Sequence, residues 1–220
     1  MKLMNEKTPL VLLGAGNFAE EIADVASECD EVEVVGFIEG IDRDRCKTDR
    51  AGLPVYWIDN LSKELDLERC RSVCGVGSTR RKEFIAQAME QGLKFTTIVH
   101  PTALVSSTAV LGDGTIVGKG TIIAAGAQLG RHVIVNRAAT IGHHVRIGDF
   151  TTIGPAANVA SSAVIGDSTF IGIGANIIDQ VSVGSHCIVG AGAAVIRDMP
   201  DRVLAVGVPA RIAREGIEGK

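Results

Sequence analysis

Two adjacent histidines, His143 and His144, are the residues of this chain whose type best suits acid–base chemistry. An imidazole exchanges a proton near neutral pH, so an outward-facing histidine is suited to act as a general base. His143 follows an Ile-Gly pair, at a place where its side chain is expected to project outward near a turn. An ordinary surface histidine is the alternative interpretation, and these two residues alone do not decide between them.

A second pattern with chemical meaning is the segment GAGNFA, which begins at Gly14 and is a GxGxxA variant of the dinucleotide fingerprint. Glycines in such a turn let backbone N–H groups and a helix N-terminus approach a phosphate, so Gly14, Gly16 and Asn17 are candidate ligand contacts. Glu39 ends the next expected strand, near where a ribose would be held. The pattern favours a nucleotide or nucleotide-sugar ligand, with NAD and a purely structural turn as alternatives.

A glycine pair, Gly75 and Gly77, closes the third expected strand, and Arg80 and Arg81 follow it. These residues lie at the carboxyl end of a strand, where the ligands of open parallel sheets bind. We therefore add Gly77 and Arg80 to the candidate phosphate contacts. The alternative is that both arginines lie on a solvated helix face.

A hexapeptide repeat dominates the second half of the chain. Every sixth residue from Val105 to Val195 is Val, Ile or Leu, and a small or β-branched residue stands two positions earlier. This period predicts a parallel β-helix, in which each repeat is one short strand plus a turn. The two recurring positions should point into the axis, and the glycine that often follows the aliphatic residue is expected to relax the turn.

The repeat also predicts which residues stack. A three-sided coil uses three hexapeptides, so residues 18 positions apart should lie about 4.8 Å from one another. His143 is then stacked between Ala125 and Ser161, whose small side chains leave space for a ligand. His132 and His186 are separated by three coils, roughly 14 Å, and cannot share a metal ion within one chain. We expect no metal site.

Before the repeat, short apolar runs alternate with segments of helical spacing. The expected strands are 9–13, 32–38, 71–76 and 95–99, and the expected helices are 18–26 and 79–91. Strands that alternate with helices are typical of a small doubly wound, Rossmann-like α/β domain with a parallel sheet. We place this domain at residues 1–101 and an all-β domain at residues 102–220.

Composition limits the possible partners. Apolar residues make up 46% of the chain but aromatic residues only 4%, which fits a narrow solenoid filled with small aliphatic side chains. The net charge of −4 and the lack of a basic run argue against nucleic acid and anionic membranes as partners. The five cysteines are scattered, and the sequence has no signal-peptide pattern or membrane-span pattern, so we expect a reduced, cytoplasmic protein.

Essentially the whole chain resembles the bacterial left-handed β-helix acyltransferases of sugar metabolism. These include sialic acid O-acetyltransferases and N-acetyltransferases of nucleotide-linked amino sugars. The resemblance rests on the hexapeptide repeat and on the segments GAGNFAEEIADV, VVGFIEG, TTIVHPTALVSSTAVLGDGTIV and VLAVGVPARI. It implies a left-handed β-helix of about five coils and a homotrimer with active sites between subunits.

The resemblance also implies roles for individual residues. Asn136 and His143 match an asparagine and a catalytic histidine that the family spaces seven positions apart. His144 stands where the family usually carries an acid that orients the imidazole and stabilises its protonated form, so either some other group orients His143 or His144 itself takes part in the reaction, across the trimer interface. Acetyl-CoA is the implied cosubstrate, held near Ser161, Ile173, Ala191, Gly192 and Pro209, and the nucleotide is expected near Gly14, Gly16 and Glu39.

The sequence therefore predicts acetyl transfer from acetyl-CoA to the amino group of a nucleotide-linked amino sugar. His143 would accept the proton that the amine loses as it attacks the thioester. A sugar O-acetyltransferase of the sialic acid type is the nearest alternative. A non-catalytic trimeric scaffold that binds a nucleotide is a second, and an NAD-dependent enzyme a third.

Overall fold

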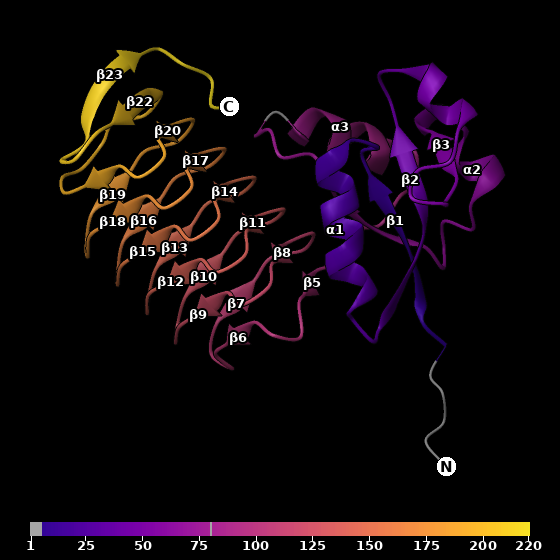
Figure 1. Ribbon diagram of the computed structural model, residues 1–220, viewed down its shortest axis with the longest axis horizontal. Helices are drawn as coiled ribbons and strands as arrows, with labels where there is room; N and C mark the ends of the chain where they lie inside the picture. The colour runs from indigo at the N-terminus through magenta and orange to yellow at the C-terminus, as the bar shows by residue number, and fades with distance from the viewer. Residues whose placement is uncertain (1–5, 80) are drawn as a thin grey trace. The chain divides into compact units, whose positions relative to one another are not determined.

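The chain folds into two compact units, seen in a computed structural model that describes residues 6–79 and 81–220 (Figure 1). The first unit contains residues up to 76 together with 83–98. The second contains residues 77–82 and 99–220. Residues 77–82 thus belong to the second unit although they precede residue 101, where we placed the domain boundary.

The first unit is built on a parallel sheet of four strands in the order β3-β2-β1-β4 within the described residues. The expected alternation of strands and helices is confirmed. Its elements in chain order are β1 (Thr8–Leu13), α1 (Asn17–Ser27), β2 (Val32–Glu39), η1 (Arg43–Lys47), β3 (Val55–Trp57), η2 (Ile58–Asn60), α2 (Leu61–Glu64), β4 (Arg71–Cys74) and, except for its first two residues, α3 (Arg81–Glu90).

Two details of this unit differ from the expectation. Strand β3 was not predicted, because three residues are too few to show a strand period. The expected fourth strand at 95–99 is wrong as a single element. Phe95 forms one isolated bridge to Ser72, whereas β5 (Ile98–Val99) joins a sheet of the second unit. Phe95 therefore pairs with a strand of the first unit and β5 with a sheet of the second. The apolar pattern of residues 95–99 does not indicate this division.

The second unit is a left-handed parallel β-helix with three sheets that run along its length (Figure 1). In the described residues the eight-stranded sheet contains β5, β8 (Ile116–Val117), β11 (Ile134–Val135), β14 (Thr152–Ile153), β17 (Phe170–Ile171), β20 (Ile188–Val189), β22 (Val203–Val206) and the antiparallel β23 (Arg211–Glu215). The six-stranded sheet contains β6 (Leu104–Val105), β9 (Ile122–Ile123), β12 (Thr140–Ile141), β15 (Asn158–Val159), β18 (Asn176–Ile177) and β21 (Ala194–Val195). The five-stranded sheet contains β7 (Val110–Leu111), β10 (Gln128–Leu129), β13 (Arg146–Ile147), β16 (Val164–Ile165) and β19 (Ser182–Val183).

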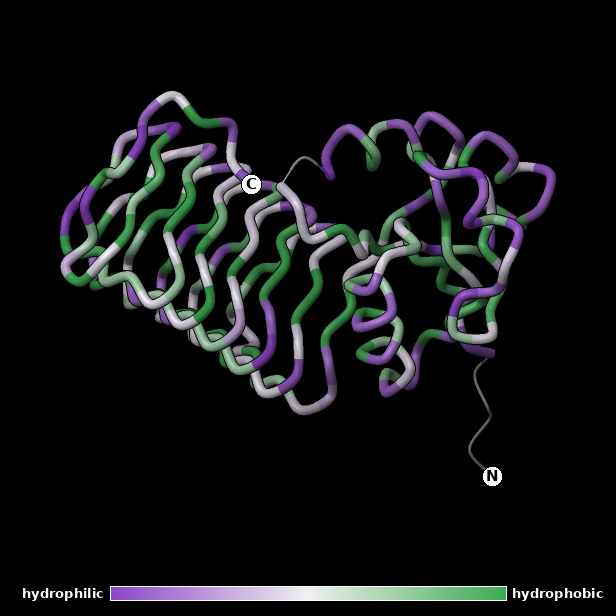
Figure 2. Tube along the Cα trace, turned by 45° about the horizontal axis from the view of Figure 1, so that its top comes forward, coloured by the Kyte–Doolittle hydropathy of each residue, from purple (hydrophilic) through white to green (hydrophobic). Residues whose placement is uncertain are grey.

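The interior of the β-helix is filled as the repeat predicts. From Val117 to Val195 the aliphatic residues are buried, and so are the small residues two positions before them. Figure 2 shows the hydrophobic segments recurring from coil to coil. Val105 and Leu111 are only partly buried because they lie in the first coil, which has no coil packed on its other side. Strand partners are 18 positions apart, as in the pair Thr140 and Asn158, so the predicted stacking is confirmed.

The glycine that follows the aliphatic residue has a different role from the expected one. A Cβ at Gly142 would lie 2.6 Å from the backbone nitrogen of Ser161 in the next coil, so the side chain is excluded by close approach of backbone. The left-handed backbone conformation occurs two positions later in each turn, where His144 has φ +58°. The expectation that this glycine relaxes the turn is therefore wrong, because its absent Cβ is what the stacked coils require.

Three corners join the three sheets. The His143 corner links the six-stranded sheet to the five-stranded sheet and consists of turns 106–109, 124–127, 142–145, 160–163 and 178–181. The Asn136 corner links the eight-stranded sheet to the six-stranded sheet through turns 118–121, 136–139, 154–157, 172–175 and 190–193. The His132 corner completes each coil through turns 112–115, 130–133, 148–151, 166–169 and 184–187.

No helix in the described parts of the chain, 6–79 and 81–220, has the length and apolar character that crossing a bilayer requires. The longest of them, α1, has 11 residues.

Candidate functional site

The first unit contains a cavity of about 480 Å³ at the carboxyl edge of its sheet. This volume is within the range of pockets that hold small ligands. Its walls come from the turn that leads from β1 into α1 and from the stretch between η1 and β3, with one residue of each of these two elements. The lining residues are Ala15, Gly16, Asn17, Arg45, Thr48, Asp49, Arg50 and Val55.

The two fingerprint glycines, Gly14 and Gly16, form the turn that leads into α1 beside this cavity. Gly14 has φ +114°, a conformation that other residues rarely adopt, and its N–H donates to the carbonyl of Ile38. Gly16 is the N-cap of α1, and no side chain caps the helix there. A Cβ at Gly16 would meet no atom within 4 Å. The positive end of the helix is therefore accessible from the cavity, an arrangement that favours anions such as phosphate.

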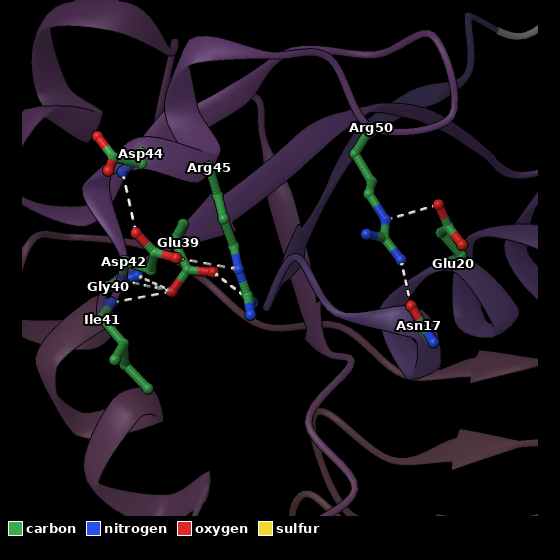
Figure 3. A network of polar contacts seen from close by, with 9 residues as sticks. All are labelled: Asn17, Glu20, Glu39, Gly40, Ile41, Asp42, Asp44, Arg45 and Arg50. Atoms are coloured by element: carbon green, nitrogen blue, oxygen red, sulfur yellow. Dashed lines mark hydrogen bonds and ion pairs between the residues drawn. The ribbon is translucent and has the colours of Figure 1, made fainter.

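Arg50 lies across the cavity and is held by two residues of α1 (Figure 3). Its Nη2 donates to the Oδ1 of Asn17 at 2.7 Å, and its Nε forms an ion pair with Glu20 at 2.5 Å. Both contacts fix the guanidinium plane beside the uncapped helix end. A fixed guanidinium next to a helix N-terminus suits a phosphate, because both supply N–H donors and positive charge.

Glu39 shapes the segment after β2 and does not line the cavity. Its Oε1 accepts the backbone N–H groups of Gly40 and Ile41 at 3.0 and 2.9 Å, and its Oε2 pairs with Arg45 at 3.1 Å (Figure 3). The side chain is buried, with 6% exposed. Its carboxylate thus holds Arg45 at the cavity wall.

Gly77 lies in the second unit, and Arg80 lies outside the described residues. Arg81 is 1% exposed, and its guanidinium donates to the carbonyls of His132 and Thr151 at 2.8 and 3.1 Å. Both expectations for Arg81 are therefore wrong: it neither reaches a phosphate nor faces solvent, because it is buried against the β-helix.

Buried Arg81 also affects the nearest histidine. His132 stacks on Phe150 with ring centroids 5.3 Å apart. Burial, followed by the positive charges of Arg81 and Arg131, lowers the pKa of His132 to about 4. A buried and neutral imidazole of this kind has a structural role and no access to a substrate.

His143, by contrast, is exposed on its corner of the β-helix. Its carbonyl accepts the N–H of Ser162 at 2.9 Å, which stacks its turn on the next coil. Its Nδ1 lies 3.1 Å from the Nδ1 of His144, and the two rings meet edge to face at 84°. The sequence placed the His143 side chain near a turn but did not reveal this contact.

A groove of about 500 Å³ runs along the outer face of the six-stranded sheet, between the His143 corner and the Asn136 corner. Gly142, the residue before His143, is one of its walls. The groove is lined by Ile122, Ala124, Thr140, Ile141, Gly142, Asn158, Val159, Ala160, Asn176, Ile177, Ile178 and Asp179. An open, mostly apolar groove with a few amide groups fits a long and flexible ligand better than a compact one.

The expected acetyl-CoA contacts lie on the two edges of this face. Ser161 is on the His143 corner. On the Asn136 corner, Gly192 donates its N–H to the carbonyl of Ile173 at 2.8 Å. Ala191 is in the same turn as Gly192. Pro209 directly precedes Ala210, whose N–H donates to the carbonyl of Ala194 at 2.7 Å. Ile173, Ala191, Gly192 and Pro209 thus form one continuous edge.

Asn136 does not meet His143 within one chain, because the two residues lie on different corners of the six-stranded sheet. The Nδ2 of Asn136 donates to the carbonyl of Ile153 at 3.1 Å. Its backbone carbonyl accepts from the Thr121 hydroxyl at 3.0 Å. In a single subunit the side chain therefore ties neighbouring coils together.

Within the described residues, no three His, Cys, Asp or Glu side chains are grouped so that they could hold a metal ion. The residues that sequence reasoning missed are Arg45, Asp49 and Arg50, which lie in a polar stretch without regular period. The signal that could have found the two arginines is the recurrence of basic residues in the segment that follows the second expected strand.

Comparison with known proteins agrees with both units. The family model of the PglD N-terminal domain matches residues 9–89, and the model of the bacterial transferase hexapeptide (six repeats) matches residues 162–197. A search of curated proteins found no match.

Solved structures cover nearly the whole chain. A variant of perosamine N-acetyltransferase from Caulobacter crescentus, in complex with CoA and GDP-perosamine, is 31% identical with a TM-score of 0.85, covering 94% of this chain and 97% of that one. The acetyltransferase domain of PglB from Neisseria gonorrhoeae, in complex with acetyl coenzyme A, is 30% identical with a TM-score of 0.83, covering 94% and 100%. WeeI from Acinetobacter baumannii, at 21% identity and a TM-score of 0.76 over 92% and 98%, has the same fold.

The resemblance inferred from the sequence is confirmed by these matches, since two of the solved enzymes are at least 30% identical over almost their full length. The protein is an acetyltransferase, and it belongs to the hexapeptide-repeat, left-handed β-helix family of sugar acetyltransferases.

Proposed function

We propose that this enzyme transfers an acetyl group from acetyl-CoA to the amino group of a nucleotide-linked amino sugar, with His143 as the general base. The observation that carries the proposal is the position of His143. It is exposed, and it directly follows a wall residue of the groove on the six-stranded sheet. Support for the substrates comes from the related perosamine enzyme, which was solved with CoA and GDP-perosamine. That enzyme was also solved with one of its histidines replaced by asparagine or alanine.

The cavity of the first unit would hold the nucleotide. Arg50 and the open N-terminus of α1 offer donors and positive charge to a diphosphate. Asp49, on the same wall, offers an acceptor to hydroxyl or base N–H groups. A cavity with both kinds of group suits a nucleoside diphosphate better than an apolar ligand.

The groove on the six-stranded sheet would hold the acyl donor. Asn158 and Asn176 line it and are already linked side chain to side chain at 3.0 Å, so its floor is fixed before a ligand arrives. Its mostly apolar wall and its amide groups suit the pantetheine arm of acetyl-CoA, which carries amides on an aliphatic chain. The adenine end would reach the edge formed by Ile173, Ala191, Gly192 and Pro209.

In the reaction, His143 removes a proton from the acceptor nitrogen as this nitrogen forms a bond to the acetyl carbonyl carbon. Acetyl-CoA supplies a thioester, whose C–S bond breaks with the electron pair leaving on sulfur. His143 then returns its proton to the sulfur, so the products are an amide and the free thiol. Alignment of two bound substrates contributes further acceleration, because it converts a bimolecular step into one within a complex.

We further propose that the enzyme works as a homotrimer. Leu104, on the six-stranded sheet but outside the lining of the groove, is an apolar side chain that is 67% exposed. Packing of one β-helix against another would cover such side chains. It would also bring the Asn136 corner of one subunit toward the His143 corner of its neighbour, where Asn136 could assist the reaction. Light scattering after size exclusion tests the trimer, and a monomeric active enzyme would contradict it.

The experiment that tests the reaction compares His143→Ala with His186→Ala, a control histidine on a different corner. We expect kcat of the His143 variant to fall by about 100-fold or more, while the Kd for acetyl-CoA in calorimetry stays within about threefold. His186→Ala should keep wild-type kcat. If His143→Ala retains most of the wild-type kcat, the assignment of His143 as the general base is wrong.

The acceptor is identified by mass spectrometry of products from a panel of nucleotide-linked amino sugars and free sialic acids. An N-acetylated nucleotide sugar is the expected product. Acetylation of a sialic acid hydroxyl would instead select the O-acetyltransferase alternative.

A further inference from the structure

The contact between His143 and His144 constrains their protons. Their Nδ1 atoms lie 3.1 Å apart, which is hydrogen-bond distance for two nitrogens. An imidazole nitrogen donates only when it carries a proton and accepts only when it does not. A hydrogen bond between the two neutral rings therefore requires that one Nδ1 carries a proton and that the other does not.

The position of the His144 ring depends on the coil before it. His144 has a left-handed backbone conformation, with φ +58°, and its N–H donates to the carbonyl of Ala125 at 3.0 Å. Its ring lies over Gly126, where a Cβ would come within 3.1 Å of the His144 Cδ2 and 3.2 Å of its Nε2. The absent side chain at position 126 therefore gives the imidazole the room it occupies beside His143.

We propose that His144 is a positioning residue that selects the tautomer of His143. Its unprotonated Nδ1 accepts the Nδ1–H of His143, and this leaves the Nε2 of His143 as the basic nitrogen. His144 keeps its own proton on Nε2. The inference rests on the proposed function, since it concerns the nitrogen with which His143 takes the proton from the acceptor amine.

This arrangement differs chemically from a histidine oriented by a carboxylate. A carboxylate both accepts the Nδ1–H and stabilises the imidazolium that forms when the base takes a proton. A neutral imidazole can accept the Nδ1–H, but it has no negative charge with which to stabilise the imidazolium. His144 thus provides orientation and tautomer selection while leaving the protonated form of His143 without a paired anion from this position.

The direct test is ¹⁵N NMR of the histidine side chains in the resting, substrate-free protein, with assignments from His143→Gln and His144→Gln. We expect His143 as the Nδ1–H tautomer and His144 as the Nε2–H tautomer at pH near 8. The reverse tautomers would overturn the proposal. This measurement does not need turnover, so it separates failure of the pair from failure of His143 as a base.

The kinetic test uses His144→Phe, which keeps a ring over Gly126 but cannot accept a hydrogen bond, and His144→Glu, which can. We expect kcat of the Phe variant to fall about 10- to 100-fold, with both KM values within about threefold. The Glu variant should recover most of this loss, and the acid limb of its pH–rate profile should move to higher pH because a carboxylate favours the imidazolium. Wild-type kcat in His144→Phe, or no recovery in His144→Glu, would overturn the proposal.

Two glycine-to-alanine variants test whether Gly126 determines the position of the His144 ring. Gly126 and Gly120 both have left-handed backbones, with φ +68° and +65°, but a Cβ at Gly120 would meet no atom within 4 Å. Each alanine substitution carries the same backbone strain, and only Gly126→Ala presses on His144. We expect Gly126→Ala to lower kcat severalfold below Gly120→Ala. Equal kcat in the two variants would contradict the role of Gly126.

Discussion

The Nη2 of Arg50 donates to the Oδ1 of Asn17 across 2.7 Å, although the two residues are 33 positions apart in the chain. The contact joins the segment after η1 to the first residue of α1, so the guanidinium is fixed at the open helix end. Glu20 completes the arrangement with an ion pair to the Arg50 Nε. The sequence predicts where α1 begins, but only the tertiary structure brings Arg50 next to that helix end.

Substitution of Arg50 should weaken binding of the nucleotide. We expect Arg50→Gln to raise the KM for the nucleotide-linked acceptor about tenfold or more, because a charge-assisted contact to phosphate is lost. The KM for acetyl-CoA should stay unchanged in steady-state kinetics. Arg43→Gln is the control, since Arg43 stacks on Trp57 at 4.9 Å and does not line the cavity. Equal effects of the two substitutions on this KM would contradict a role of Arg50 in binding the nucleotide.

The stacked coils predict that Gly142→Ala destabilises the protein more than Gly120→Ala does. A Cβ at position 142 meets backbone nitrogen at 2.6 Å, and backbone in a β-helix has little freedom to shift. We expect a loss of roughly 2–3 kcal/mol or more from overpacking. At Gly120 the cost is about 1 kcal/mol, because only the left-handed conformation is unfavourable. Thermal unfolding at fixed protein concentration measures both, and the opposite order would contradict this explanation.

The pKa of His132 predicts how stability depends on pH. Burial lowers the pKa of this imidazole to about 4, whereas in the unfolded chain it is near 6.5. The unfolded state therefore binds the proton more tightly. The contribution of His132 to stability is full above pH 6.5 and decreases as pH falls toward 4, by up to roughly 3 kcal/mol.

His132→Phe keeps a ring that can stack on Phe150 and cannot take a proton. We expect its free energy of unfolding to change less between pH 7 and pH 4 than that of the wild type, measured with urea at each pH. An equally steep change in the variant would show that other groups cause the acid sensitivity.

Buried Arg81 predicts a large effect from a residue outside the proposed reaction. Arg81→Met removes the guanidinium donor to the carbonyl of His132 and one of two donors to the carbonyl of Thr151, which keeps the N–H of Ile134, and we expect a loss of roughly 2–4 kcal/mol. The pKa of His132, followed by NMR, should also rise, because a positive charge that lowers it is removed. Lys82→Met, at an exposed position next to it, should leave both quantities unchanged. A wild-type pKa of His132 in Arg81→Met would contradict the assigned charge effect.

The sequence by itself determined the β-helix, because a six-residue period decides which side chains face the axis and which residues stack. It also determined the fingerprint turn at Gly14 and Gly16, since that signal is local to one strand, one turn and one helix. Tertiary structure decided the rest. Arg50 meets Asn17, and Arg81 is buried against His132, through contacts between segments that no period relates. The contact between the Nδ1 atoms of His143 and His144 depends on the orientation of the His144 ring over Gly126, and a sequence gives adjacency but not the angle between two rings.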